Sequence, residues 1–207
     1  QADNNIAIGE SALAGAAATS GNSNIAIGTT AMDALTTGAC NIAMGENALG
    51  AATIGLKNIA IGQLAMSGVT TLQADNNIAI GVSALVGTSA TAGDNNVAIG
   101  LCAGCAMTTG SNNVAIGRNA MDALTTGGYN VAIGIAALGG ANVSGANNIA
   151  IGTTAMDALT TGACNVAIGV NALGAATDNH NNIAIGRAAL AASANDADNN
   201  IAIGYTA

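Results

Sequence analysis

Residues 24–41 read NIAIGTTAMDALTTGACN, and the same eighteen residues recur without a change at 148–165. The stretch opens and closes on an Asn, and the closing Asn begins another copy of an NIAIG-like word. The word occurs twelve times, at spacings of 17 to 19 residues, and the copies leave no room for a separate domain. A fixed period of this kind is typical of repeat architectures, so residues 1–207 are predicted to form one repeat domain.

The aligned copies share the pattern N-[IV]-A-[IM]-G-x-x-A, in which the Asn, the Gly and both Ala are present in all twelve. The next position is Leu or Met in ten of the eleven copies that reach it, and Gly104 is the exception. We assign structural roles to the repeated Asn and Gly, which in the first five copies are Asn5, Gly9, Asn24, Gly28, Asn41, Gly45, Asn58, Gly62, Asn77 and Gly81.

Each copy has the pattern of a short strand with a period of two, in which Ile6 and Ile8 share one face while Asn5 and Ala7 share the other. Gly9 ends the strand, and the pair Ala12-Leu13 predicts a second short strand. One unit is too small to bury its apolar side chains alone, so successive units must stack. The chain is therefore predicted to be an all-β protein, a parallel β-solenoid of about twelve coils, with the repeated Asn side chains hydrogen-bonded as a ladder.

The composition excludes several classes of protein. The chain is 51% hydrophobic but contains no Phe, Trp or Pro, which argues against an ordinary globular core. The net charge is −8, and Lys57, Arg118 and Arg187 are the only cations, so nucleic acid is a poor partner. No run of about 18 apolar residues is present to insert into a membrane.

The repeated Ala of the strands allows two interpretations. If the Ile and Val side chains face inward, the Ala form an outer row of small side chains that another chain could approach closely. This candidate oligomer interface comprises Ala7, Ala26, Ala43, Ala60, Ala79, Ala98 and Ala115. If the Ile and Val side chains face outward instead, the same Ala fill a narrow interior beside the Asn ladder.

A column of Thr suggests a second class of function. Stacked Thr on a flat face are typical of ice-binding solenoids, and the position twelve residues after the Asn is Thr or Ser in six successive copies. The candidate ice face comprises Thr36, Thr53, Thr70, Thr108 and Thr125. Thr is also an ordinary residue of strands and turns, so the column is ambiguous.

Residues with reactive side chains are few. Cys102 and Cys105 form a C-x-x-C, a motif that can carry redox or metal chemistry. No second Cys or His cluster accompanies it, so small, inert thiols are the expectation. His180 is expected to be solvated in a turn, and the repeated Asp are expected to form turns. No catalytic residue, metal site or cofactor is predicted, and we expect no enzyme.

The pattern N-[IV]-A-[IM]-G-x-x-A resembles the head repeats of YadA-like trimeric autotransporter adhesins, and NNVAIGRNAMDALTTG at 112–127 also resembles repeats of phage tail fibres and large bacterial surface proteins. The resemblance covers the whole chain. It implies a left-handed parallel β-roll, three chains about one axis, and an extracellular role at a cell surface or in a phage tail.

These observations together predict a segment of a longer structural fibre or adhesin rod that serves surface attachment or host contact. The expected partners are copies of the chain, with a trimer favoured, and a host-surface receptor. The alternatives are a subunit that assembles end to end into a filament and an ice-binding β-solenoid.

Overall fold

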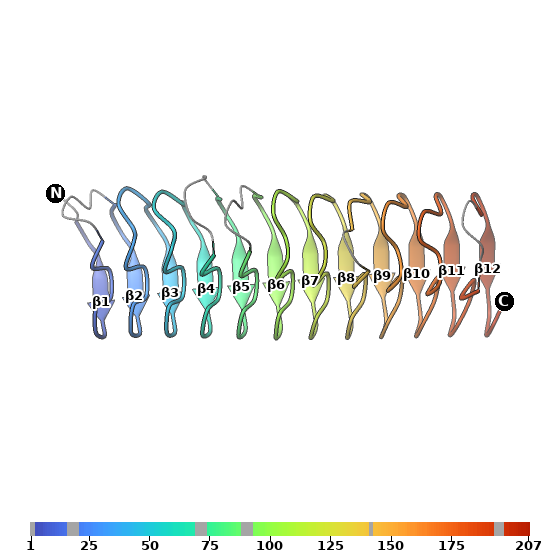
Figure 1. Cartoon of the computed structure of the whole chain (residues 1–207), viewed down its shortest axis with the longest axis horizontal. Coiled ribbons are helices and arrows are strands. Elements are labelled where there is room, and N and C mark those ends of the chain that lie inside the picture. The colour runs from blue at the N-terminus through green and yellow to red at the C-terminus, as the bar shows by residue number, and fades with distance from the viewer. Residues whose placement is uncertain (1–2, 16–20, 69–73, 88–92, 141–142, 193–196) are drawn as a thin grey trace.

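The structure is a computed structural model that describes residues 3–15, 21–68, 74–87, 93–140, 143–192 and 197–207. These residues form twelve three-residue strands and no helix, and the strands stack in chain order into one parallel sheet along an elongated rod (Figure 1). The prediction of an all-β parallel β-solenoid is confirmed. The strands are β1 (Ile6–Ile8), β2 (Ile25–Ile27), β3 (Ile42–Met44), β4 (Ile59–Ile61), β5 (Ile78–Ile80), β6 (Val97–Ile99), β7 (Val114–Ile116), β8 (Val131–Ile133), β9 (Ile149–Ile151), β10 (Val166–Ile168), β11 (Ile183–Ile185) and β12 (Ile201–Ile203).

The register places identical positions of the repeat above one another. Between β2 and β3, for example, Ala26 pairs with Ala43 and Ile27 pairs with Met44. Parallel strands lie about 4.8 Å apart, so twelve of them make a rod roughly 55 Å long. Because every coil has nearly the same neighbours above and below, nearly the same sequence suits every coil.

The strand Ala face inward, which corrects the expectation of an outer Ala row. Ala26, Ala43, Ala60, Ala79 and Ala115 are fully buried. Ala98 is 1% exposed, and Ala7 in the first strand is exposed. The Ile and Val of the same strands lie on the outer face, at intermediate to high exposure. The physical reason is space, because the opposite wall of the coil fills the interior with Leu and Met and leaves room for only a methyl group under the sheet.

The Gly after each strand makes the corner possible. All twelve of these Gly have φ between 130° and 141°, a region that L-residues with a side chain rarely adopt. In Gly117 an added Cβ would lie 2.4 Å from the carbonyl oxygen of Gly134 in the next coil. Both the conformation and the close contact between coils therefore require Gly at this position.

The second short strand predicted at Ala12-Leu13 does not form. Leu13 has φ 53°, and Met32 and Leu49 at the equivalent position each have φ 52°, so the backbone turns instead of extending. A left-handed conformation costs a residue with a side chain about 1–2 kcal/mol. Full burial of a Leu or Met side chain contributes about 1.5–3 kcal/mol, so core packing outweighs the strain. These residues still link the coils, since the Leu13 N–H donates to the Ala31 carbonyl at 2.8 Å.

Candidate functional site: an outer aliphatic face over an asparagine ladder

The Asn ladder predicted from the sequence is present inside the rod. The Asn41 backbone N–H donates to Asn24 Oδ1 at 2.9 Å, and Asn41 Nδ2 donates to the same oxygen at 3.1 Å and to the Gly55 carbonyl at 2.7 Å. The same backbone bond joins Asn58 to Asn41 and Asn77 to Asn58. Each of these ladder amides thus finds its hydrogen-bond donors and acceptors within the rod, and the bonds hold equivalent residues of successive strands in register.

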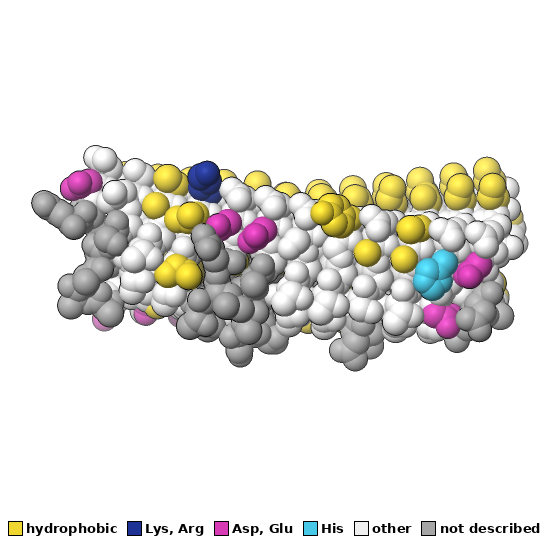
Figure 2. Space-filling model, turned by 90° about the horizontal axis from the view of Figure 1, so that it is seen from above, with side chains coloured by type: hydrophobic (Ala, Val, Ile, Leu, Met, Phe, Trp, Pro, Cys, Tyr) yellow, Lys and Arg dark blue, Asp and Glu magenta, His cyan; other side chains and the backbone are white. Residues whose placement is uncertain are grey.

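The outer side of the sheet is a continuous surface of aliphatic side chains, which we call the aliphatic face. It consists of the two outward residues of each strand: Ile6, Ile8, Ile25, Ile27, Ile42, Met44, Ile59, Ile61, Ile78, Ile80, Val97, Ile99, Val114, Ile116, Val131, Ile133, Ile149, Ile151, Val166, Ile168, Ile183, Ile185, Ile201 and Ile203. Figure 2 shows hydrophobic side chains in a regular row along one long edge of the rod. None of these side chains carries a charge.

The outward residues of this face recur at the same position of every coil. Ile80, Ile99, Ile133 and Ile168 are each 36% to 37% exposed, whereas the equivalent Ile27, Ile61, Ile116, Ile151 and Ile185 are less exposed. The parallel register stacks these equivalent side chains above one another. The aliphatic face is therefore periodic along the rod, although the exposure of its side chains varies from coil to coil.

The residue directly after the corner Gly is exposed in every coil and varies in chemistry. It is apolar in five coils, as Val82, Leu101, Ile135, Val170 and Tyr205, which are 44% to 68% exposed. In other coils it is polar or charged, and it can then form a hydrogen bond with the equivalent residue of the next coil. Gln63 donates to Glu46 at 2.8 Å, and Arg187 donates to the Tyr205 hydroxyl at 2.8 Å.

The Thr column of the candidate ice face has its hydroxyl protons engaged within the rod. Thr36 Oγ1 donates to the Thr53 carbonyl at 2.9 Å, Thr108 Oγ1 donates to the Thr125 carbonyl at 2.9 Å, and Thr125 Oγ1 donates to the Val143 carbonyl at 3.3 Å. These side chains are half-buried. Thr70 lies outside the described residues. The hydroxyl groups of Thr36, Thr108 and Thr125 thus extend the bonding between coils and offer a ligand only their acceptor oxygens.

Two of the repeated Asp join neighbouring coils, a role that the expectation of turn-forming Asp did not include. Asp75 Oδ1 accepts the Leu56 N–H at 2.8 Å, and Asp94 Oδ1 accepts the Asp75 N–H at 2.8 Å. Burial raises the pKa of Asp122 and of Asp157 above the usual 3.8, and for Asp122 a hydrogen bond with Asn119 acts in the opposite direction. Within the described ranges, no group of three or more His, Cys, Asp or Glu side chains is arranged to hold a metal ion.

His180 and the cysteines differ in part from the sequence expectation. The His180 side chain is about half exposed, as predicted, and its Nδ1 lies 3.7 Å from Asp198 Oδ1. Cys40 and Cys164 are free and exposed. Cys102 and Cys105 form a disulfide, so the expectation of two inert thiols is wrong. Sequence spacing did not reveal the bond, because it depends on the local turn that brings the two Cα atoms to 5.0 Å.

Comparison of the chain with protein-family models, with curated proteins and with solved structures finds no match. No helix long and apolar enough to cross a bilayer occurs in the part of the chain that the structure describes.

Proposed function

We propose that the chain is a segment of an extracellular fibre or adhesin rod, a structural protein without enzymatic activity whose copies associate side by side through the aliphatic face. The observation that carries the proposal is the size of this face. Twelve strands make it roughly 55 Å long and two outward side chains make it roughly 10 Å wide, on the order of 500 Å². Apolar patches of more than a few hundred Å² on soluble proteins usually mark interaction sites.

A second copy of the chain is the partner that this face fits best. Two aliphatic faces have the same strand spacing, so their side chains can interdigitate along the whole rod. A pair would bury on the order of 1,000 Å² in total, the lower limit for a specific interface. No charge within the face would have to be buried without a partner. A face-to-face pair is one arrangement of this surface. The resemblance to trimeric adhesin heads favours another, in which three copies turn their aliphatic faces toward one axis and present the variable outer residues to a host surface.

The test is the mass of the purified chain in solution, measured by light scattering under reducing conditions. The unmodified chain should give a multiple of 19.5 kDa, with three chains favoured. The double variant Ile99→Asp/Ile133→Asp places charges in the middle of the aliphatic face and should give the mass of one chain. The matched control Thr109→Asp/Thr126→Asp adds the same charge at exposed positions outside the face and should leave the mass unchanged.

Other outcomes would separate the alternatives. A single-chain mass for the unmodified protein would reject side-by-side association. An open-ended mass distribution that the Ile variants leave unchanged would favour an end-to-end filament. Ice binding is the less favoured function, because the Thr hydroxyl protons are engaged in bonds between coils. Measurable thermal hysteresis of the freezing point would favour ice binding instead.

A further inference from the structure

The coil that begins at Asn96 departs from the others in its core. Gly104 stands where ten coils have Leu or Met, and it has the same left-handed conformation, with φ 61°. A Cβ at Gly104 would lie 3.2 Å from Leu85 Cδ1 and 3.4 Å from Met107 Cε. Neighbouring side chains thus reach into the space that the missing side chain leaves.

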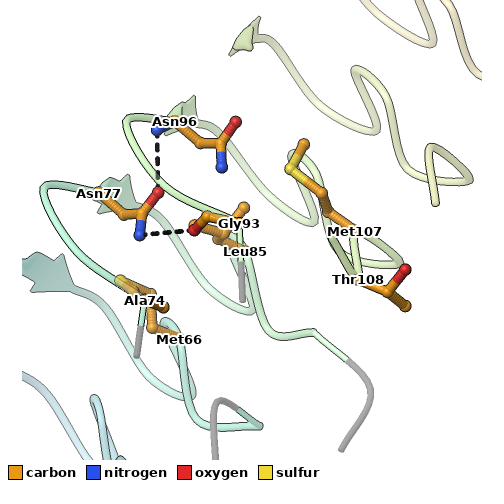
Figure 3. Close-up of a pocket in the computed structure, with 8 residues that line it drawn as sticks. All are labelled: Met66, Ala74, Asn77, Leu85, Gly93, Asn96, Met107 and Thr108. Carbon is orange, nitrogen blue, oxygen red and sulfur yellow. Dashed lines mark hydrogen bonds between the residues drawn. The ribbon is translucent and has the colours of Figure 1, made fainter. Parts of the chain in front are cut away.

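Leu85 and Met107 also line a small cavity of about 10 Å³, together with Met66 and the Asn ladder (Figure 3). On the ladder side, the Asn96 N–H donates to Asn77 Oδ1 at 2.9 Å. This coil therefore has one large apolar side chain fewer than the coils that carry a Leu or Met here, and the segment around Gly104 has less apolar packing to hold it.

The disulfide lies across this same position. Cys102 and Cys105 flank Gly104, and both are half-buried, so solvent reaches the pair. The segment between them also bonds to both neighbouring coils, because the Cys102 N–H donates to the Val82 carbonyl at 3.0 Å and the Gly104 N–H donates to the Ala120 carbonyl at 2.9 Å. A covalent link across four residues restricts the backbone of this segment. In the other coils the packing of a Leu or Met side chain has that effect.

The surroundings also suit the reduced form of the pair. Cys105 Sγ lies 3.6 Å from the Asp122 carbonyl oxygen, within reach for a thiol to donate a hydrogen bond. After reduction the two sulfurs must separate to van der Waals distance, and the Cys105 thiol has this carbonyl as a hydrogen-bond partner. The same contact places the Asp122 backbone on one side of Cys105 Sγ.

We propose that the Cys102–Cys105 pair is a redox site that exchanges with dithiols and thereby locks or loosens residues 101–107 of the rod. A thiolate of the dithiol attacks Cys102 Sγ and forms a mixed disulfide, while the bond between the two cysteines breaks and Cys105 leaves as a thiolate that takes up a proton. The second thiolate of the dithiol then displaces Cys102, which is protonated in turn. Two electrons pass to the protein, and the dithiol becomes its own disulfide.

The experiment uses the full chain with Cys40→Ser and Cys164→Ser, which removes the two exposed thiols outside the pair. The protein is treated with N-ethylmaleimide under native conditions, with and without dithiothreitol, and its intact mass is measured. Hydrogen exchange of the Cys102 and Gly104 amides is followed in the same two states. We expect no label without dithiothreitol, two labels with it, and exchange roughly tenfold faster after reduction. The amides of the coil that begins at Asn148 should not change.

A variant with Cys102→Ser and Cys105→Ser added is the matched control. It should show the faster exchange permanently and should not respond to dithiothreitol. Three results would each overturn the proposal: labels on the untreated protein, which would mean that the bond does not form; no labels with dithiothreitol until the chain is denatured; or equal exchange in both redox states.

Discussion

Replacing Asn113 by Asp tests whether the Asn ladder holds the rod together through the hydrogen atoms of its amides. Asn113 is fully buried, and its Oδ1 accepts the Asn130 N–H at 2.9 Å. Its Nδ2 donates to the Gly127 carbonyl at 3.0 Å and to Asn96 Oδ1 at 3.2 Å. An ionised Asp has nearly the same shape and keeps the first bond, but it places a carboxylate oxygen against two acceptor oxygens.

The expected cost at neutral pH follows from these contacts. A buried charge without a positive partner costs about 3–5 kcal/mol. Protonation of the carboxyl restores one donor toward Gly127, after which the remaining cost is about 1–2 kcal/mol for the second lost bond. The variant Asn113→Asp should therefore be much less stable than the unmodified chain at pH 8 and close to it at pH 4.

The direction of the pH dependence is fixed by burial. Desolvation raises the pKa of the introduced carboxyl above its unfolded value of about 3.9, so the folded state binds more protons above that pH. The free energy of unfolding then falls as pH rises from about 4 through the folded pKa, by at most about 1.4 kcal/mol per pH unit. Urea unfolding followed by circular dichroism at a series of pH values measures this slope, relative to the unmodified chain.

Asn113→Ala is the matched control, because it removes the same Nδ2 bonds without adding a titratable group. It leaves the Asn130 N–H and the Gly127 carbonyl without partners, at a cost of about 2–6 kcal/mol that should not vary with pH. Equal stability of Asn113→Asp and the unmodified chain at pH 8, or a cost that stays constant from pH 4 to pH 8, would refute the proposed role of the ladder.

Three further substitutions follow from the backbone and from burial. Gly117→Ala should lower the free energy of unfolding by at least about 3 kcal/mol, because φ is 133° and the new Cβ would lie 2.4 Å from the Gly134 carbonyl oxygen; unchanged urea unfolding would contradict this. Ala188→Asn should raise the free energy of unfolding by about 0.5–1 kcal/mol, since Asn tolerates φ 55° better than Ala. The same change at the buried neighbour Ala189 should lower the melting temperature. Asp122→Asn should raise the melting temperature at pH 7 but not at pH 3. Burial raises the pKa of Asp122 above 3.8, so the folded state loses stability as pH rises from 3.8 through the folded pKa. An equal change in melting temperature at both pH values would contradict this reasoning.

The repeat pattern was sufficient to predict the fold and the Asn ladder. Because each coil contacts only its neighbours, an Asn and a Gly that recur every 17 to 19 residues must stack in columns whatever the rest of the coil does. The Gly corner could be predicted for the same reason. The turn at Leu13 could not, since an apolar pair after a corner is equally compatible with a strand, and only the close opposite wall requires φ 53° there.

The candidate interaction surface was undecided in the sequence, because Ile6 and Ala7 are both apolar and a strand with apolar residues on both faces does not indicate which face is buried. The disulfide between Cys102 and Cys105 was missed, and two inert thiols were expected, since C-x-x-C spacing does not determine whether the two sulfurs meet. The sequence by itself determined a one-dimensional stack of coils, with its period, its parallel register and its Asn column. The tertiary structure decided which side of the sheet faces out, because only the width of the closed coil limits the interior to Ala and leaves the larger Ile and Val side chains on the surface.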